Sequence, residues 1–274
     1  MKYKMLLGMS KEPGISEEQR TFLRDCLAKE RFIRICRWLF FLSFLALWEI
    51  GARVGFLNPF IFSSPGRILK SAVSMASDGT LFYHLGITLF ETFFSFFIVM
   101  AFGILAAVLL WWKESLARIL EPYLIVLNSL PKTALAPIFI VWLGNNMKTI
   151  IVAAVSVAVF GTIITLYTDF ISVEEDKIKL IRTLGGTRKD ILFKVILPSN
   201  IPSIISIMKV NIGLSLVGVI IGEFLAAKAG LGYLIIYGSQ VFKLDWVMMS
   251  IVILCIAAAG LYQLLSIAER KTER

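Results

Sequence analysis

Cysteine and histidine are both scarce in this sequence of 274 residues. Cys26, Cys36 and Cys255 lie far apart, without the spacing of a disulfide framework or a zinc site. His84 is the single histidine, so it has no second imidazole with which to form a metal site, and we assign it no chemistry. The sequence also lacks a Gly-x-x-x-x-Gly-Lys-Ser/Thr phosphate loop. These absences leave little basis for an enzyme.

Charged residues are also few, at 17% of the chain, whereas 58% of the residues are hydrophobic and the mean hydropathy is +0.81. The apolar residues form runs of about 20, the length of helix that crosses the hydrocarbon core of a bilayer. We therefore expect an all-α membrane protein. Six transmembrane helices are predicted at residues 38–57, 86–112, 123–143, 149–166, 203–221 and 246–265. The first contains Glu49 and Arg53, whose i,i+4 spacing allows them to pair.

The basic residues indicate the orientation of these helices. Most of the 28 Lys and Arg residues fall before residue 38, after the last helix and in the loops on that same side. Positive side chains resist translocation, so both termini are predicted to be cytoplasmic. The same bias explains the net charge of +9 without a nucleic-acid partner.

The chain is expected to have four parts. Residues 1–37 form a cytoplasmic amphipathic segment, whose helix begins at a capping pattern at Ser16. Residues 38–84 hold the first transmembrane helix and an external linker. Residues 85–265 form the core transmembrane domain with a cytoplasmic loop at 172–198, and residues 266–274 form a cytoplasmic tail.

The loop at 172–198 carries clear helix signals. Ser172 with Glu175 predicts a capping box, and an apolar stripe follows until Gly185-Gly186 interrupts it. Thr187 and Asp190 then supply a second cap, and an apolar run leads to Pro198. We expect a short helix, a glycine corner and a second short helix. Such a rigid element could transmit force to the helices at its two ends, or could simply join them.

The stretch from Arg182-Thr183-Leu184-Gly185-Gly186 to Val195-Ile196-Leu197-Pro198 resembles the EAA loop of binding-protein-dependent ABC importer permeases. The spacing between Gly185 and Pro198 is kept, whereas Lys179-Leu180-Ile181 replaces Glu-Ala-Ala. Ser129-Leu130-Pro131, Trp142-Leu143-Gly144 and Gly222-Glu223-Phe224 are similar to the branch that serves nitrate, sulfonates, taurine and bicarbonate. The resemblance extends from about residue 62 to 270.

The resemblance implies a type I importer permease with a methionine-permease-like fold in the inner membrane. It further implies a pair of permease copies, two cytoplasmic ATPase subunits that bind ATP and Mg, and an external solute-binding protein. This chain would then need no cofactor and would not itself be an enzyme. The ATPase-coupling role carries over to Thr183, Leu184, Gly185, Gly186, Thr187 and Arg188.

Polar residues inside predicted transmembrane helices are costly and need an explanation. Lys209 with Asn211, and Asn128, Ser129 and Lys132 beside Pro131, could line a path for an anion. Lys209 could instead snorkel or pair with a carboxylate, and Pro131 with Pro137 could only kink a helix. Glu223 is interpreted as a gate or a subunit contact, and Glu91 receives no role. Gly218 and Gly222 permit close helix packing, within the chain or at a dimer seam.

The preferred function is translocation of a small, anionic solute such as nitrate, a sulfonate, taurine or bicarbonate. The alternative within transport is a permease for a thiamine-pyrimidine precursor or another small organic solute. A polytopic membrane enzyme is a remote alternative, because it would need a cluster of His, Asp or Glu at one face. A purely anchoring protein would not need intramembrane Lys and Glu residues.

Overall fold

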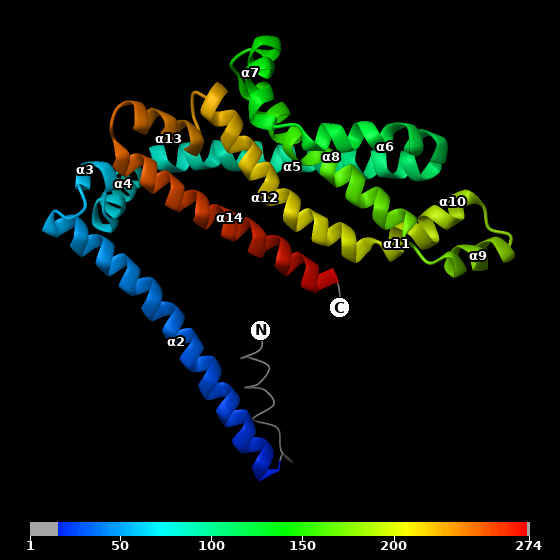
Figure 1. Cartoon of the computed structure of the whole chain (residues 1–274), viewed down its shortest axis with the longest axis horizontal. Helices are drawn as coiled ribbons and strands as arrows, with labels where there is room; N and C mark the ends of the chain where they lie inside the picture. Colours follow the sequence, from blue (N-terminus) through cyan, green and yellow to red (C-terminus); the bar gives the residue numbers. More distant parts are fainter. Residues whose placement is uncertain (1–15, 273–274) are drawn as a thin grey trace. The chain divides into compact units, whose positions relative to one another are not determined.

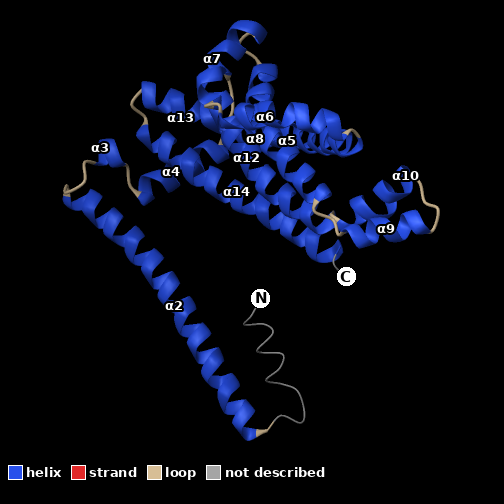
Figure 2. Ribbon diagram, turned by 45° about the vertical axis from the view of Figure 1, so that its right-hand side comes forward, coloured by secondary structure: helices blue, strands red, loops and turns tan. Residues whose placement is uncertain are grey.

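The computed structural model describes residues 16–272, and these form helices and no strand. They divide into two compact units, residues 16–68 and residues 69–272, which are described separately. Figure 2 shows the helical composition of both units. The all-α class expected from the apolar runs is confirmed.

The first unit is dominated by one continuous helix, α2 (Glu17–Val54). It begins at a capping box between Ser16 and Gln19 and ends at Gly55, whose φ is +84°. The amphipathic segment and the first transmembrane helix, which the sequence suggested as successive elements, are therefore a single helix. The short helix α3 (Pro59–Phe62) follows, and α4 (Pro65–Ser77) begins in this unit.

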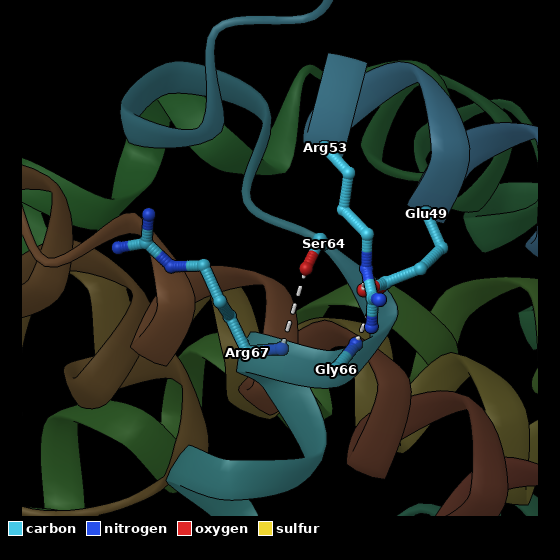
Figure 3. A network of polar contacts seen from close by, with 5 residues as sticks. All are labelled: Glu49, Arg53, Ser64, Gly66 and Arg67. Carbon is cyan, nitrogen blue, oxygen red and sulfur yellow. Dashed lines mark hydrogen bonds and ion pairs between the residues drawn. The ribbon is translucent and has the colours of Figure 1, made fainter. Parts of the chain in front are cut away.

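The Glu49 carboxylate organises the end of α2 (Figure 3). Arg53 Nε donates a hydrogen bond of 2.8 Å to Glu49 Oε1, which confirms the pairing expected from their spacing. The second oxygen, Oε2, accepts a hydrogen bond of 2.9 Å from the backbone N–H of Gly66. Gly66 lies in the first turn of α4, where backbone N–H groups have no partner within the helix. These two contacts explain how the Glu49 carboxylate is tolerated in this apolar helix.

The core of the second unit consists of three long helices that pack on one another: α5 (Thr80–Trp112), α8 (Met147–Ile171) and α12 (Ile201–Ala226). Helix α13 (Leu231–Gln240) and helix α14 (Leu244–Thr272) complete this unit after α12 (Figure 1). The sequence analysis did not predict α13, because its ten residues are too few to cross a bilayer.

Small residues let α8 and α12 approach closely. A Cβ added to Gly218 would lie 2.6 Å from Ala154 Cα, and one added to Gly222 would lie 2.9 Å from Ile150 Cα. No side chain fits at these distances, so glycine is needed at both positions. Of the two interpretations that the sequence left open, the structure therefore supports packing within the chain.

The third predicted transmembrane helix, residues 123–143, is not one helix. It consists of α6 (Glu114–Ser129) and α7 (Lys132–Leu143), which meet at an angle of 95°. The break falls at Leu130-Pro131, because Pro131 has no N–H to continue the hydrogen bonds of α6. Within residues 16–272, five helices are thus long and apolar enough to cross a membrane, or six with this bent pair.

Candidate functional site

The loop at 172–198, which we call the elbow, joins α8 to α12 at one end of the second unit (Figure 1). Its first helix, α9 (Glu175–Thr183), begins after Glu174. The predicted capping box at Ser172 is wrong: the Ser172 hydroxyl donates to Thr168 O at the end of α8. The three residues that replace Glu-Ala-Ala have different surroundings. Lys179 Nζ lies 3.1 Å from Glu175 Oε2, Leu180 is exposed, and Ile181 packs against the buried core.

The corner of the elbow depends on both glycines. Gly185 has a φ of +79°, a left-handed conformation that a β-branched residue adopts only with strain. Gly186 donates a hydrogen bond of 2.9 Å to Ile181 O, and a Cβ at this position would lie 2.8 Å from that oxygen. Leu184 precedes the corner and is 75% exposed. The predicted glycine corner is therefore present, with an apolar side chain at its tip.

The second helical segment consists of α10 (Arg188–Ile191), a π-helical turn at Leu192–Ile196 and α11 (Leu197–Ser199). Thr187 and Asp190 form the expected capping box at its start. Lys194 lies 2.7 Å from the Asp190 carboxylate. Its ammonium and the Thr187 hydrogen bonds hold the pKa of Asp190 well below its ordinary range. Asp190 therefore stays ionised and keeps the cap in place at physiological pH.

The base of the elbow is buried against the long helices. Ile191, Leu192 and Ile196 form one apolar cluster with Ala107 of α5 and with Leu166 and Phe170 of α8. At the outer side, the Arg188 guanidinium lies 5.5 Å from the ring of Trp111 and 5.7 Å from that of Trp112. It also donates a hydrogen bond of 3.1 Å to Trp111 O. The elbow is thus fixed to α5 and α8 and exposed at its tip.

The residues predicted to line a path lie at three separate places. At the α6–α7 break, Lys132 Nζ donates to Leu127 O at 2.7 Å and to Asn128 O at 2.5 Å, so its charge covers carbonyls that the break leaves free. Ser129, in the same turn, donates to Ile125 O. The sequence correctly grouped Asn128, Ser129 and Lys132 around this break.

Lys209 and Asn211 have partners on other helices. Lys209 of α12 forms an ion pair with Glu269 of α14, which is the carboxylate pairing that the sequence left open. Asn211 is buried and exchanges hydrogen bonds with Thr162 of α8, with Asn211 Nδ2 2.8 Å from Thr162 Oγ1. Lys209 and Asn211 are therefore engaged in contacts between helices.

Glu223 lies at the other end of α12 from the elbow and is 1% exposed. Its Oε1 accepts a hydrogen bond of 2.7 Å from Thr88, and its Oε2 accepts one of 2.5 Å from the N–H of Gly232 in the first turn of α13. The N–H of Leu231 donates to Thr88 Oγ1 at 2.8 Å, and that of Gly230 donates to His84 Nδ1 at 3.0 Å. The Glu223 carboxylate thereby caps α13 and closes the α12–α13 corner on α5.

This network shows what the sequence analysis missed. His84, to which we assigned no chemistry, accepts a backbone hydrogen bond and stacks on Tyr233 at 6.0 Å. Neither that contact nor the fit of Arg188 on two tryptophans could be recognised, because the partners are far apart in sequence. Within residues 16–272, no three His, Cys, Asp or Glu residues are grouped to hold a metal ion.

The architecture and the elbow agree with known proteins. A family model described as the binding-protein-dependent transport system inner membrane component matches residues 99–270. The chain belongs to this family. It is a multi-pass inner-membrane permease, and the family resemblance read from the elbow is confirmed.

Two curated relatives and one solved structure illustrate the match. The formylaminopyrimidine transport permease protein ThiX of Halalkalibacterium halodurans is 31% identical over 71% of this chain and 77% of its own length. The taurine transport system permease protein TauC of Escherichia coli is 24% identical over 78% of this chain and 80% of its own. An inward-facing structure of the MetNI methionine ABC transporter has a TM-score of 0.64 at 21% identity and covers 71% of this chain and 97% of its own. The type I importer permease fold is thus confirmed.

Proposed function

We propose that this permease works as the membrane subunit of an ATP-driven importer. In this assembly two permease copies pair, two cytoplasmic ATPase subunits bind ATP and Mg and hydrolyse the nucleotide, and an external binding protein delivers the solute. The distribution of Lys and Arg supports an orientation with both termini and the elbow in the cytoplasm. The family match supports partners of these kinds.

The observation that carries this proposal is the contrast between the two ends of the elbow. Leu184 presents an apolar side chain to the outside, whereas Ile191 and Ile196 are buried among the long helices. A partner that binds the tip can therefore move α5, α8 and α12 together, because the base of the elbow is closely packed against them and moves with them as a rigid body. We assign the ATPase contact to Thr183, Leu184, Gly185, Gly186, Thr187 and Arg188.

The solute that we propose is a small anion of the nitrate, sulfonate, taurine or bicarbonate type, supported by the relatedness to TauC. A second candidate is a formylaminopyrimidine-like solute, supported by the higher identity to ThiX. The route of the solute through the membrane would be lined by Asn128, Ser129 and Lys132 at the helix break, together with Lys209 and Asn211. Glu223, which holds the α12–α13 corner, would act as a gate or at a subunit contact.

The test is Gly185→Val in the assembled transporter. A β-branched residue in the left-handed conformation of Gly185 would be strained by about 1 to 2 kcal/mol. The corner should therefore change its conformation, and the ATPase should no longer bind the elbow productively. Solute uptake and the stimulation of ATP hydrolysis by loaded binding protein should both be lost, while the amount of permease in the membrane stays unchanged.

Gly79→Val is the matched control, because Gly79 has the same φ of +79° and lies before α5, outside the elbow. Its transport should be retained. If Gly185→Val transports as well as the wild type, the elbow is not where the ATPase acts.

A further inference from the structure

Glu91 of α5 is a buried carboxyl group to which the sequence analysis gave no role. It is 2% exposed, and its Oε2 has no hydrogen-bond partner among the described residues. Its neighbour is Glu223 of α12, which is 1% exposed, and a hydrogen bond joins the two side chains. An ionised carboxylate can only accept hydrogen bonds, so this contact requires a proton on one of the two groups.

The surroundings of the pair decide which group carries the proton. Thr88 donates to Glu223 Oε1, and the N–H of Gly232 donates to Oε2. The N–H of Tyr233, also in the first turn of α13, is a third donor to Glu223. Three donors and the positive end of a helix dipole stabilise a carboxylate. Glu91 has only Glu223 as a partner, and a buried charge without a donor is costly. Glu223 is therefore the carboxylate and Glu91 the neutral acid.

The other polar groups around the pair do not neutralise it. His84 accepts a backbone hydrogen bond at Nδ1, so its ring is uncharged, and the ring of Tyr233 stacks on it. Lys228, between α12 and α13, is exposed and forms no ion pair with either carboxyl group. Asn145 and Asn146, which precede α8, do not titrate. The proton on Glu91 is thus what keeps two charges from meeting in this buried place.

We propose that Glu91 is a positioning residue, a neutral carboxylic acid whose O–H donates to the Glu223 carboxylate and keeps the α12–α13 corner closed on α5. The carboxylate fits directly against the α13 backbone, because a Cβ added to Gly232 would lie 2.8 Å from Glu223 Oε2. When the proton leaves, the two adjacent charges repel each other. The corner then loosens, so this end of the permease is sensitive to alkaline pH.

Infrared spectroscopy of the purified full-length permease in lipid nanodiscs tests the protonation directly. At neutral pH the wild type should show the carbonyl stretch of a protonated carboxylic acid, and this band should weaken as the pH rises to about 9. The band should be missing in Glu91→Gln and present in Glu223→Gln. Glu121→Gln, the same change at an exposed position of α6, should keep it. A band that survives in Glu91→Gln and is lost in Glu223→Gln would overturn the assignment.

The melting temperature tests whether the proton holds the fold together. An exposed carboxyl group in the unfolded chain is ionised at neutral pH, whereas Glu91 in the folded chain keeps its proton. The folded state therefore binds more protons, and its stability falls as the pH rises. Between neutral pH and about pH 9, the melting temperature should fall by about 4 °C more in the wild type than in Glu91→Gln. Equal falls in both proteins would overturn the proposal.

Hydrogen exchange locates the effect at the corner. At about pH 9 the amides of residues 230–234 should exchange faster in the wild type than in Glu91→Gln, whose side-chain N–H donates to Glu223 at every pH. The amides of α9 in the elbow should exchange equally in both proteins. If residues 230–234 also exchange equally, the proton on Glu91 does not position α13.

The consequence for transport rests on the proposed import function, in which this end of the permease faces outward. Uptake of radiolabelled taurine by the reconstituted transporter should fall several-fold in the wild type as the external pH rises from neutral to about 9. It should stay level in Glu91→Gln, with the same binding protein in both cases. A level profile in the wild type would overturn the role in transport. Absence of uptake in both proteins at every pH, with the infrared band and the exchange difference intact, would contradict taurine import and not the assignment of Glu91.

Discussion

Arg188 donates a hydrogen bond to the backbone carbonyl of Trp111, a residue 77 positions earlier in the chain. This contact joins α10 of the elbow to the last turn of α5. Because the guanidinium also lies over the rings of both tryptophans, it is held in one orientation. Arg188 therefore links the segment that we assign to the ATPase contact directly to a transmembrane helix.

We predict that Arg188→Ala uncouples the transporter. Arg188 belongs to the assigned ATPase contact, but its guanidinium is engaged by Trp111 and Trp112. The elbow should therefore still dock on the ATPase through Leu184 and the glycine corner, but its movement should no longer reach α5 fully. Solute uptake per ATP hydrolysed should fall about tenfold, with ATP hydrolysis itself retained. Arg188→Lys should restore little, because an ammonium group cannot reproduce the planar stacking.

Lys189→Ala is the control for this prediction, since it removes the neighbouring positive charge from an exposed position. It should transport as the wild type does. Simultaneous measurement of uptake and phosphate release in proteoliposomes gives the ratio. An unchanged ratio in Arg188→Ala would show that the contact with Trp111 carries no force.

The seam between α8 and α12 offers a second prediction. At Gly218 an added Cβ would meet the backbone of Ala154, so Gly218→Leu should force the two helices apart. Overpacking of this kind costs about 1 to 3 kcal/mol, and the melting temperature of the purified permease should fall. Gly213→Leu on the same helix is the matched control, because a Cβ there meets nothing within 4 Å. Equal melting temperatures for both variants would contradict the packing that we describe.

The elbow could be predicted from the sequence because its determinants are local. Capping by Thr187 and Asp190 and the need for Gly185 at a left-handed position act over a few residues, so they are visible in the sequence. The pairing of Glu49 with Arg53 followed from helix geometry for the same reason.

Other features depend on contacts distant in sequence, and these were missed. Pro131 and Pro137 are both prolines in the same apolar stretch, but only at Pro131 does the chain turn by 95°. Spacing could not distinguish the two, since Pro137 remains inside α7. Likewise, the hydrogen bonds of Glu223 come from Thr88 and from α13, a helix whose position is fixed by tertiary packing.

Lys209 provides the third prediction. Its two possible roles, pairing with Glu269 and lining the solute route, can be separated by changing Glu269 as well. Lys209→Met alone leaves the Glu269 carboxylate in a partly buried place without its cation, so the free energy of unfolding should fall by up to about 3 kcal/mol. The double variant Lys209→Met with Glu269→Gln removes both charges and should recover most of the lost melting temperature, because no unpaired charge remains.

Uptake by this double variant decides whether Lys209 also lines the route. If the ammonium group serves the solute, the double variant should be stable and still transport poorly, with a raised KM. If Lys209 only joins α12 to α14, stability and uptake should recover together. Glu269→Gln alone, which leaves Lys209 charged and without its partner, should keep the KM of the wild type in the first case while its melting temperature falls. Recovery of both properties in the double variant would remove Lys209 from the proposed path and leave the helix break at Lys132 as the candidate.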